Sequence, residues 1–331
     1  MKKLPLSFDE TILLLIQNVI PISLPICRLA ACLTLVWFIA ACSAKETQAV
    51  LPEGCAIGPT DQCHATPQFL STLNFERPVI DTTQEFAVGV LVRDLAGDRT
   101  DYQHDTWDDA GKVGPFAIDW LGNIFVAPTP VISLELNPVA EQNKIFKVDT
   151  RTGEMGEFIS LPWPLPPGSG NPYGVVGLAY DCDTGSLYAA SIAGSTPQDE
   201  VGVIYQIDPT SGEILSKLEN VDALGIGIFR ASQGRRLYYG AGRTPEIYSV
   251  LLAGDGRFSG QPRLEFSLAA QPGGSTDKAQ RLQFTADNSL IVKAIEFNYS
   301  LQPTSHIQKD VYTFQYQPAD DAWTLLDITE E

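Results

Sequence analysis

Histidine is scarce in this sequence, and its few copies are scattered. The 331 residues contain three, His64, His104 and His306, and none of them forms an HxxxH or HxxE pair. Catalytic transition metals are commonly held by histidines at such spacings. The sequence therefore argues against a catalytic metal centre built on histidine.

Positive charge is also scarce. The chain has 22 Lys and Arg against 40 Asp and Glu, which gives a formal net charge of −18 at pH 7. A surface this acidic repels the phosphate backbone of nucleic acids and offers no attraction to anionic lipids. We therefore expect no nucleic-acid partner, and any attachment to a membrane must depend on a dedicated anchor.

The short motifs that identify many enzymes are missing as well. The sequence contains no GxSxG, P-loop or dinucleotide-binding fingerprint, and no CxxC pair. These absences leave open whether the chain is an enzyme, and they favour a protein that is not one.

The N-terminal end has the layout of a secretory signal. The basic residues Lys2, Lys3 and Arg28 precede an uninterrupted apolar run, LAACLTLVWFIA (29–40), and small residues stand directly before Cys42. An uncleaved membrane helix fits this run less well, because spanning a bilayer takes about 20 apolar residues.

This end of the chain resembles a bacterial lipoprotein, whose signal peptide is cut before a lipid-bearing cysteine. The resemblance implies a signal peptide over residues 1–41 and a Cys42 that carries fatty acids such as palmitate and anchors the protein to a membrane. Ser43 replaces the Asp that usually retains lipoproteins in the inner membrane, which implies export to the outer membrane or the cell surface. Residues 42–66 are predicted to form a polar tether, followed by one domain over residues 67–331.

Export also decides how the cysteines are interpreted. Cys27 and Cys32 would leave with the signal peptide, and an oxidising compartment favours disulfides among the rest. Cys55 and Cys63 flank the segment AIGPTDQ, which can close as a hairpin, so we predict a Cys55–Cys63 disulfide. Cys182 is then left without a partner.

Two segments of the domain are nearly the same. Residues 145–156 read IFKVDTRTGEMG, and residues 204–215 read IYQIDPTSGEIL. Each begins with alternating apolar and polar residues, turns at an Asp and a Gly, and enters a second strand-like run. Because Asp accepts hydrogen bonds from a turn backbone and Gly adopts a positive φ, each segment predicts a β-hairpin.

Another hairpin precedes each of these two, and the same pair of hairpins recurs twice later in the chain. The strands group into sets of four over residues 114–161, 174–219, 223–268 and 279–328. Four strands per unit, repeated about every 50–60 residues, indicate an all-β fold, a β-propeller with four-stranded blades. Residues 66–113 supply a degenerate fifth blade, and dividing that region differently would give six.

The segments IDWLGNIFVA (118–127) and QIDPTSGE (206–213) resemble the SMP-30, NHL and YVTN-like superfamily of propellers. The resemblance covers residues 70–331 and rests on turn motifs, so it implies a fold more than an activity. Lactonases of similar fold hold a divalent cation with carboxylates and Asn at the mouth of the central channel. The residues that the topology places near such a mouth are Asp109, Asn171, Asp222, Arg243 and Glu296. Each of these residues is equally compatible with a solvated position at the rim of the channel and no role in binding.

One acidic segment has a spacing that is partly typical of a calcium loop. Asp94, Asp98 and Asp105 occupy the first, fifth and twelfth positions of such a loop. Ala96 and Arg99 stand where a ligand and a Gly are expected, however, and the closing residue is Asp instead of Glu. An acidic surface turn is the simpler interpretation, and a metal site is the alternative.

Long loops gather on one face of the predicted propeller. They join the second and third strands of three blades, at residues 128–143, 192–202 and 296–310, and a long link covers residues 161–174. Loops on a rigid scaffold are common binding sites. The loop aromatics that would supply contact area are Trp163, Tyr173, Phe297 and Tyr299.

The sequence therefore predicts an exported, lipid-anchored, monomeric propeller that binds a protein or glycan partner through this face without catalysing a reaction. The alternative from a different class is an SMP-30/lactonase-like hydrolase with a carboxylate-bound cation, calcium or another divalent ion, in the central channel. The binding function requires no cofactor.

Overall fold

In the computed structural model, the chain consists of two units, Met1–Thr47 and Gln48–Glu331. It describes residues 56–82, 87–96, 101–130, 136–166, 170–301 and 309–330. The predicted signal peptide, Cys42 and Cys55 lie outside the described residues. Within the described ranges, no helix is both long and apolar enough to cross a membrane.

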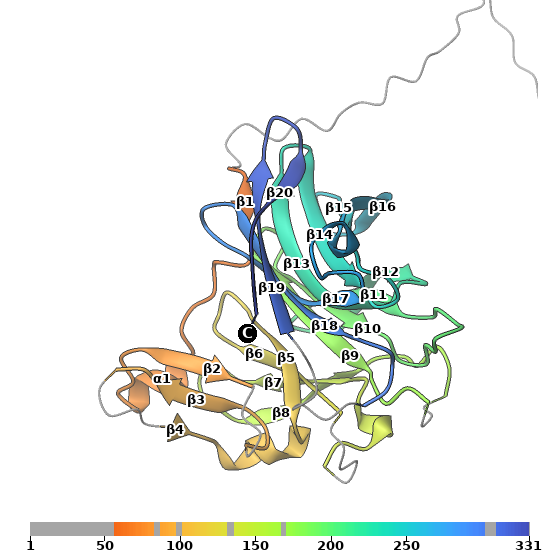
Figure 1. Cartoon of the computed structure of the whole chain (residues 1–331). Helices are drawn as coiled ribbons and strands as arrows, with labels where there is room; N and C mark the ends of the chain where they lie inside the picture. Colours follow the sequence, from red (N-terminus) through yellow and green to blue (C-terminus); the bar gives the residue numbers. More distant parts are fainter. Residues whose placement is uncertain are drawn as a thin grey trace, which may run out of the picture. The chain divides into compact units, whose positions relative to one another are not determined.

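The second unit consists of five antiparallel sheets that follow one another along the chain (Figure 1). The first contains β2 (Pro78–Asp81), β3 (Leu91–Asp94) and β4 (Asp101–Tyr102). The second contains β5 (Val113–Ile118), β6 (Ile124–Pro128), β7 (Lys144–Val148) and β8 (Met155–Ser160). The third contains β9 (Val175–Asp181), β10 (Ser186–Ser191), β11 (Val203–Ile207) and β12 (Ile214–Glu219).

The fourth sheet contains β13 (Ala223–Ala231), β14 (Gly234–Ala241), β15 (Glu246–Leu252) and β16 (Phe258–Ser267), with the short β1 (Gly58–Pro59) added beside β13. The fifth contains β17 (Asp277–Phe284), β18 (Ser289–Glu296), β19 (Lys309–Gln317) and β20 (Ala322–Glu330). The described helices are the short α1 (Gln68–Thr72), η1 (Asp105–Ala110), η2 (Val139–Glu141) and η3 (Leu268–Ala270).

The five sheets are the blades of a β-propeller, which confirms the predicted fold and the count of five. The four predicted quartets match the second to fifth blades to within one or two residues at each end. The first blade has three strands among its described residues. Its short strands explain why the sequence pattern there is degenerate.

The two similar segments form the same hairpin in neighbouring blades. In the second blade, Asp149 accepts hydrogen bonds from the backbone N–H groups of Arg151 and Thr152, at 2.8 and 3.0 Å. In the third blade, Asp208 accepts hydrogen bonds from the backbone N–H groups of Thr210 and Ser211. Each turn is completed by a glycine with a φ of 76°, Gly153 or Gly212. These backbone donors hold the pKa of both carboxyls below the usual value, so both act as charged turn caps.

The core lies between neighbouring blades. Four clusters of buried apolar side chains join the first blade to the second, the second to the third, the third to the fourth and the fourth to the fifth. The first strands of the blades approach closely, so some positions have room only for glycine. A Cβ on Gly177 would lie 2.6 Å from the carbonyl oxygen of Leu224 in the next blade. Likewise, a Cβ on Gly225 would lie 2.7 Å from the carbonyl oxygen of Gln280.

The alternating strand direction gives each blade two ends. We call the end that carries the tight turns within the hairpins, such as 119–123, 182–185 and 285–288, the plain face. The other end carries the loops between the second and third strands and the links between blades, and we call it the loop-rich face. The predicted separation into one simple and one elaborate face is thus present, although residues 302–308 of the last loop lie outside the described residues.

The predicted Cys55–Cys63 disulfide is wrong, because Cys63 is bonded to Cys182. Cys182 lies in the β9–β10 turn on the plain face, where residues 56–66 run past it. Cys55 is much nearer to Cys63 in the sequence, but it is Cys182, 119 positions away, that the fold brings to Cys63. The end of the predicted tether is thus bound to the propeller by a covalent bond and by the pairing of β1 with β13.

Candidate functional site

Asp222 is the centre of a buried polar cluster beneath the loop-rich face. It lies in the link between the third and fourth blades and is 1% exposed. Its carboxylate accepts hydrogen bonds from the Ser195 hydroxyl, from the Gly202 backbone N–H at 3.0 Å and from the Tyr299 hydroxyl at 2.5 Å. The Arg243 guanidinium lies 3.6 Å away. We call these five residues the Asp222 cluster.

The partners of Asp222 come from the loops of three blades. Ser195 and Gly202 belong to the 192–202 loop of the third blade, Arg243 to the β14–β15 turn of the fourth, and Tyr299 to the loop after β18 in the fifth. One buried carboxylate therefore holds three loops in fixed positions relative to one another. A buried carboxylate with several donors is stable only while all of them stay in place.

Asn171, in the link between the second and third blades, also holds the 192–202 loop in place. Its Nδ2 donates to the carbonyl oxygens of Ile192 at 2.8 Å and Ser195 at 2.9 Å, and its Oδ1 accepts the backbone N–H of Tyr173 at 2.9 Å. Asn171 is 6% exposed. Its amide therefore fixes the start of the 192–202 loop to the long link between the second and third blades.

Arg243 completes the support of this loop. Its Nη1 donates to the carbonyl oxygen of Thr196 at 2.8 Å, and its Nη2 donates to that of Pro197 at 2.6 Å. The guanidinium carbon also lies 6.0 Å from the centre of the Tyr299 ring. Three of the five predicted site residues, Asn171, Asp222 and Arg243, therefore converge on one loop.

Burial raises the pKa of Tyr299, and its hydrogen bond to Asp222 raises it further. The phenol therefore stays protonated and donates to the carboxylate. Tyr299 is 4% exposed and has a positive φ of 64°, which is unusual for a residue with a large side chain. Such a conformation persists only where the surroundings hold it, and here the Asp222 cluster does so.

Three of the four predicted contact aromatics pack against one another. The Phe297 ring centre lies 5.3 Å from that of Tyr173 and 4.9 Å from that of Tyr299. They form a small apolar cluster with the buried Ile192 and Leu224. Because these three aromatics pack against one another beneath the loops, they offer little surface to a partner. Trp163 is therefore the predicted contact aromatic that is best placed to bind one.

Asp109 and Glu296 do not join the Asp222 cluster. Asp109 is exposed in η1, between the first and second blades. Glu296 is exposed at the end of β18, where it accepts a hydrogen bond from the Thr276 hydroxyl at 3.1 Å. It is next to Asp277, which is buried and accepts a hydrogen bond from the Tyr312 hydroxyl at 2.7 Å.

Asp94, the first residue of the predicted calcium loop, has a structural role. It accepts hydrogen bonds from the backbone N–H groups of Glu76, Arg77 and Ala96 at 3.2, 2.9 and 3.0 Å. These donors, led by that of Ala96, hold its pKa below the usual value. Asp105 is exposed in the first turn of η1, and Asp98 lies outside the described residues. Among the residues with assigned positions, no group of three His, Cys, Asp or Glu side chains is placed to hold a metal ion.

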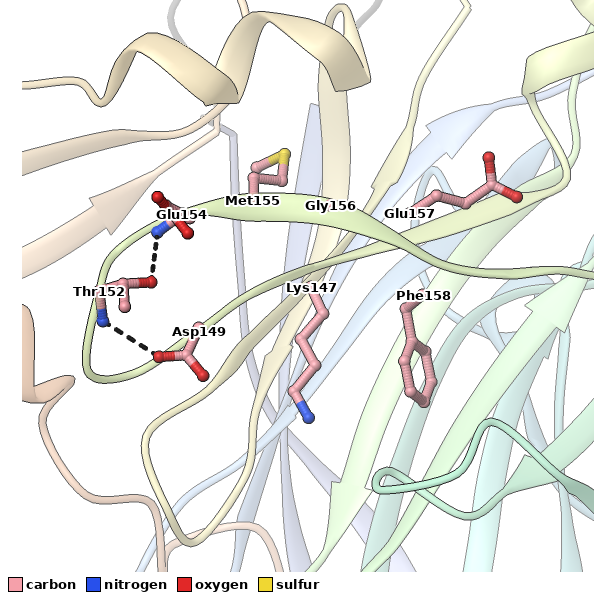
Figure 2. Close-up of a pocket in the computed structure, with 8 residues that line it drawn as sticks. All are labelled: Lys147, Asp149, Thr152, Glu154, Met155, Gly156, Glu157 and Phe158. Carbon is pink, nitrogen blue, oxygen red and sulfur yellow. Dashed lines mark hydrogen bonds between the residues drawn. The ribbon is translucent and has the colours of Figure 1, made fainter.

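One open hollow lies along β7 and β8, with a volume of about 470 Å³ (Figure 2). Lys147 and Phe158 point to the same side of the hairpin in this view. The Lys147 Nζ lies 5.6 Å from the centre of the Phe158 ring and donates to the carbonyl oxygen of Pro209 at 3.1 Å. The bond to Pro209 joins the second blade to the third. The lining residue Lys147 thus contributes to the packing of these two blades.

A second hollow, of about 480 Å³, lies between the start of the 161–174 link and the outer strands of the third blade. We call it the Trp163 hollow. Its lining combines an apolar wall with a polar rim and consists of Pro162, Trp163, Pro164, Val201, Val203, Tyr205, Ile214, Lys217, Glu219 and Asn220. Trp163 is partly exposed at its edge.

The backbone beside Trp163 is firmly held. Asn143, which is fully buried, donates from Nδ2 to the carbonyl oxygens of Leu161 at 3.1 Å and Pro162 at 2.9 Å. Its Oδ1 accepts the Ser191 hydroxyl at 2.5 Å. Sequence reasoning missed Asn143 and Ser195, because single polar residues at loop ends give no signal of their long-range partners.

No protein-family model matches the sequence, and no curated protein matches it. Solved structures of similar fold include a virginiamycin B lyase from Staphylococcus aureus, 15% identical over 83% of this chain and 86% of that chain, with a TM-score of 0.41. A luciferin-regenerating enzyme is 12% identical over 83% of this chain and 80% of that chain, with a TM-score of 0.46. At these values the matches say nothing about activity, and the assignment as a propeller rests on the strand order given above.

The Asp222 cluster generates a prediction about stability. Asp222→Ala leaves the Tyr299 hydroxyl and the Gly202 N–H without their acceptor, so we expect a loss of about 3 kcal/mol in the free energy of unfolding. Tyr299→Phe removes one donor and should cost about 1 kcal/mol. Urea denaturation measures both, with Gln198→Ala on the exposed part of the same loop as the control. Equal midpoints for Asp222→Ala and Gln198→Ala would contradict the proposed support of the loop.

The buried Asp277 at the start of β17 generates a prediction about pH. Burial raises the pKa of Asp277, so the folded state keeps this proton to a higher pH than the unfolded state. Stability is therefore lost as pH rises from about 4 through the folded pKa. Asp277→Asn keeps the acceptor for Tyr312 and should raise Tm at pH 7 by about 1–2 °C.

This gain should disappear when melting is measured below about pH 4, because Asp277 is then neutral in both states. The exposed Asp320→Asn removes one carboxylate in the same way and is the matched control for the change in net charge. A gain for Asp277→Asn that is equal at pH 3 and pH 7 would contradict the assignment.

Proposed function

We propose that this chain is an exported, lipid-anchored bacterial surface protein that binds a protein or glycan partner through the loop-rich face without catalysing a reaction. The observation that carries the proposal is the Asp222 cluster, which fixes the loops of three blades to one another. A surface that is ordered before binding loses less conformational entropy when the partner arrives. Rigid loops on a rigid scaffold are therefore well suited to recognition.

The Trp163 hollow is the part of this face best suited to make the contact. The partly exposed Trp163 and the exposed Pro162 and Pro164 offer flat apolar surface, and Lys217, Glu219 and Asn220 offer polar groups at the rim. Trp in a firmly held position is typical of the residues that dominate binding energy. The net charge of −18 favours a partner that is neutral or basic.

The hydrolase alternative receives less support from these contacts. A cation in the channel would need free carboxylate and amide oxygens, and Asp222 was one candidate ligand. Both of its oxygens are engaged, by Ser195 and Gly202 on one side and by Tyr299 on the other. The Asn171 oxygen is engaged by the N–H of Tyr173. Releasing these groups would free the loops that they hold.

The place where the tether joins the propeller agrees with the proposed anchoring. The described chain begins at Ala56, whose carbonyl oxygen accepts a hydrogen bond from Arg230 near the β13–β14 turn of the plain face. The described end of the predicted tether thus lies at the plain face, away from the loops of the loop-rich face. This supports a loop-rich face that stays accessible to partners.

The anchoring part of the proposal predicts the behaviour of Cys42→Ser. Without the acylated cysteine, we expect the protein to move from the membrane fraction to the soluble fraction of the cell envelope. Fractionation with immunoblotting measures this, and Cys55→Ser serves as the control because it leaves the lipid site intact. Membrane retention of Cys42→Ser equal to that of the unmodified chain would contradict the lipid anchor.

The binding part predicts a difference between two tryptophans. Trp163 lies at the loop-rich face, whereas Trp120 is 60% exposed in a turn of the plain face. After screening the Cys42→Ser protein against immobilised glycans and purified envelope proteins, we expect Trp163→Ala to weaken binding of the retained ligand about tenfold or more. Trp120→Ala should leave the Kd unchanged.

Two outcomes would contradict this assignment. The first is a Kd that rises with Trp120→Ala and not with Trp163→Ala. The second is hydrolysis of lactones or esters by the purified protein that is lost in Asp222→Asn or Glu296→Gln, since it would favour the hydrolase.

A further inference from the structure

We propose that residues 56–69 form a strap that fastens all five blades across the plain face, and that a dithiol opens it by reducing the Cys63–Cys182 disulfide. Figure 1 shows this segment running from β1, beside the fourth and fifth blades, to α1 at the first blade. The inference does not depend on the proposed binding function.

The first part of the strap contacts the fifth and fourth blades. Ile57 packs against the apolar cluster that joins these two blades. A Cβ on Gly58 would lie 3.4 Å from the Asn288 side-chain oxygen in the β17–β18 turn. Gly58 and Pro59 pair with Arg230 and Phe229 of β13, and the Thr60 N–H donates to the Ile228 carbonyl oxygen at 3.4 Å.

The middle of the strap is bonded to the third blade. The Cys63–Cys182 disulfide joins it to the β9–β10 turn. The Cys182 N–H also donates to the Thr60 carbonyl oxygen at 2.8 Å. The disulfide and this hydrogen bond thus hold the strap at the turn.

The last part of the strap contacts the second and first blades. A Cβ on Gly122, in the β5–β6 turn, would lie 3.0 Å from the Ala65 carbonyl oxygen. The N–H groups of Gln68 and Phe69 donate to the Thr150 hydroxyl at 3.1 Å and the Thr150 carbonyl oxygen at 2.9 Å. Phe69 then enters the apolar cluster of the first and second blades.

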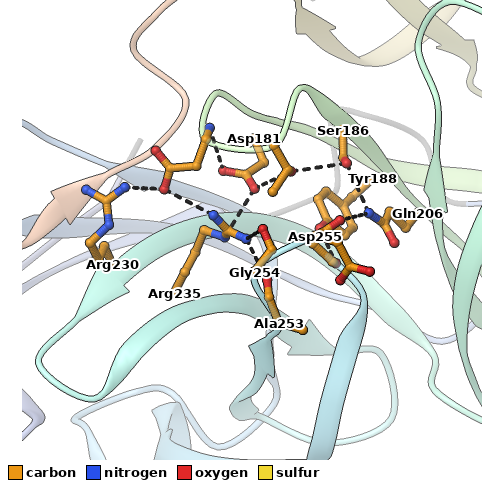
Figure 3. A network of polar contacts seen from close by, with 12 residues as sticks. Asp181, Ser186, Tyr188, Gln206, Arg230, Arg235, Ala253, Gly254 and Asp255 are labelled. Atoms are coloured by element: carbon orange, nitrogen blue, oxygen red, sulfur yellow. Dashed lines mark hydrogen bonds and ion pairs between the residues drawn. The ribbon is translucent and has the colours of Figure 1, made fainter. Parts of the chain in front are cut away.

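An ionic network holds the turn that carries Cys182 against the fourth blade (Figure 3). Arg235 lies 3.2 Å from the buried Asp181 and 3.3 Å from Asp183, the two neighbours of Cys182. Arg230 also pairs with Asp183 while it donates to the Ala56 carbonyl oxygen at 3.0 Å. The disulfide is therefore attached at the junction of two blades and the strap.

The strap matters because the ring needs a connection between its ends. Four apolar clusters join successive blades, but none of the clusters formed by described residues joins the fifth blade to the first. The strap reaches from the fifth blade at Ile57 to the first at Phe69. It thus provides a connection between the two end blades.

The disulfide is open to exchange because Cys63 is exposed. A thiolate of a dithiol attacks the Cys63 sulfur, the S–S bond breaks, and the Cys182 thiolate leaves and takes a proton. The second thiol of the reagent then attacks the mixed disulfide and releases Cys63 as a thiol. The protein gains two electrons and two protons, and the dithiol becomes a cyclic disulfide.

The test compares the Cys42→Ser protein with and without dithiothreitol. Reduction should lower Tm by at least about 5 °C, since the disulfide closes a long loop. Hydrogen exchange should become faster in β2–β4 and in β17–β20, the strands at the two ends of the ring. Adding Cys63→Ser should give the reduced behaviour permanently and make it insensitive to dithiothreitol, whereas adding Cys55→Ser should leave the response unchanged.

Two results would overturn the proposal. One is an unchanged Tm and unchanged exchange in the Cys42→Ser protein after reduction, verified by labelling of the free thiols. The other is faster exchange confined to residues 60–66, with the first and fifth blades as protected as before. If the Cys63→Ser protein does not fold, the reduction of the folded disulfide-containing protein decides the question alone.

Discussion

No blade of this propeller can cover its own apolar side chains, and the rest of the structure follows from that constraint. Each sheet has two faces, and buried apolar clusters join each blade to the next one along the chain. The first strands therefore approach so closely that Gly177 and Gly225 have no room for a side chain. The hairpin turns and loops are pushed to the two ends of the blades, where they form the plain and loop-rich faces.

Local chemistry explains how much of the fold could be predicted from the sequence. The turns at Asp149 and Asp208 are encoded within a few residues, because the carboxylate caps backbone groups two and three positions later. Such turns recur with the blades, so the strand quartets could be located closely. The Cys63–Cys182 bond joins residues 119 positions apart, and nothing in the local sequence distinguishes it from a pairing with the nearer Cys55.

Only part of the candidate site could be predicted, because its long-range contacts, like the disulfide, leave no signal in the local sequence. Topology alone placed Asn171, Asp222 and Arg243 on one face, and the structure brings all three to the 192–202 loop. Their role as supports depends on Ser195, Gly202 and Tyr299, which reach Asp222 from positions 20 to 77 residues away. Distances of that kind are fixed by the packing of the blades. The sequence could therefore indicate where the face lies but not which side chains are already engaged on it.

The strap has a consequence for the order in which the chain folds. It is synthesised before every blade, yet Cys63 must wait for Cys182, and Ala56 must wait for Arg230, which follows 174 residues later. Contacts between such distant residues form late, because the loop between them must first be closed. The earliest segment of the domain to leave the ribosome is thus among the last to be fixed, and its disulfide can form only after the β9–β10 turn of the third blade has been made.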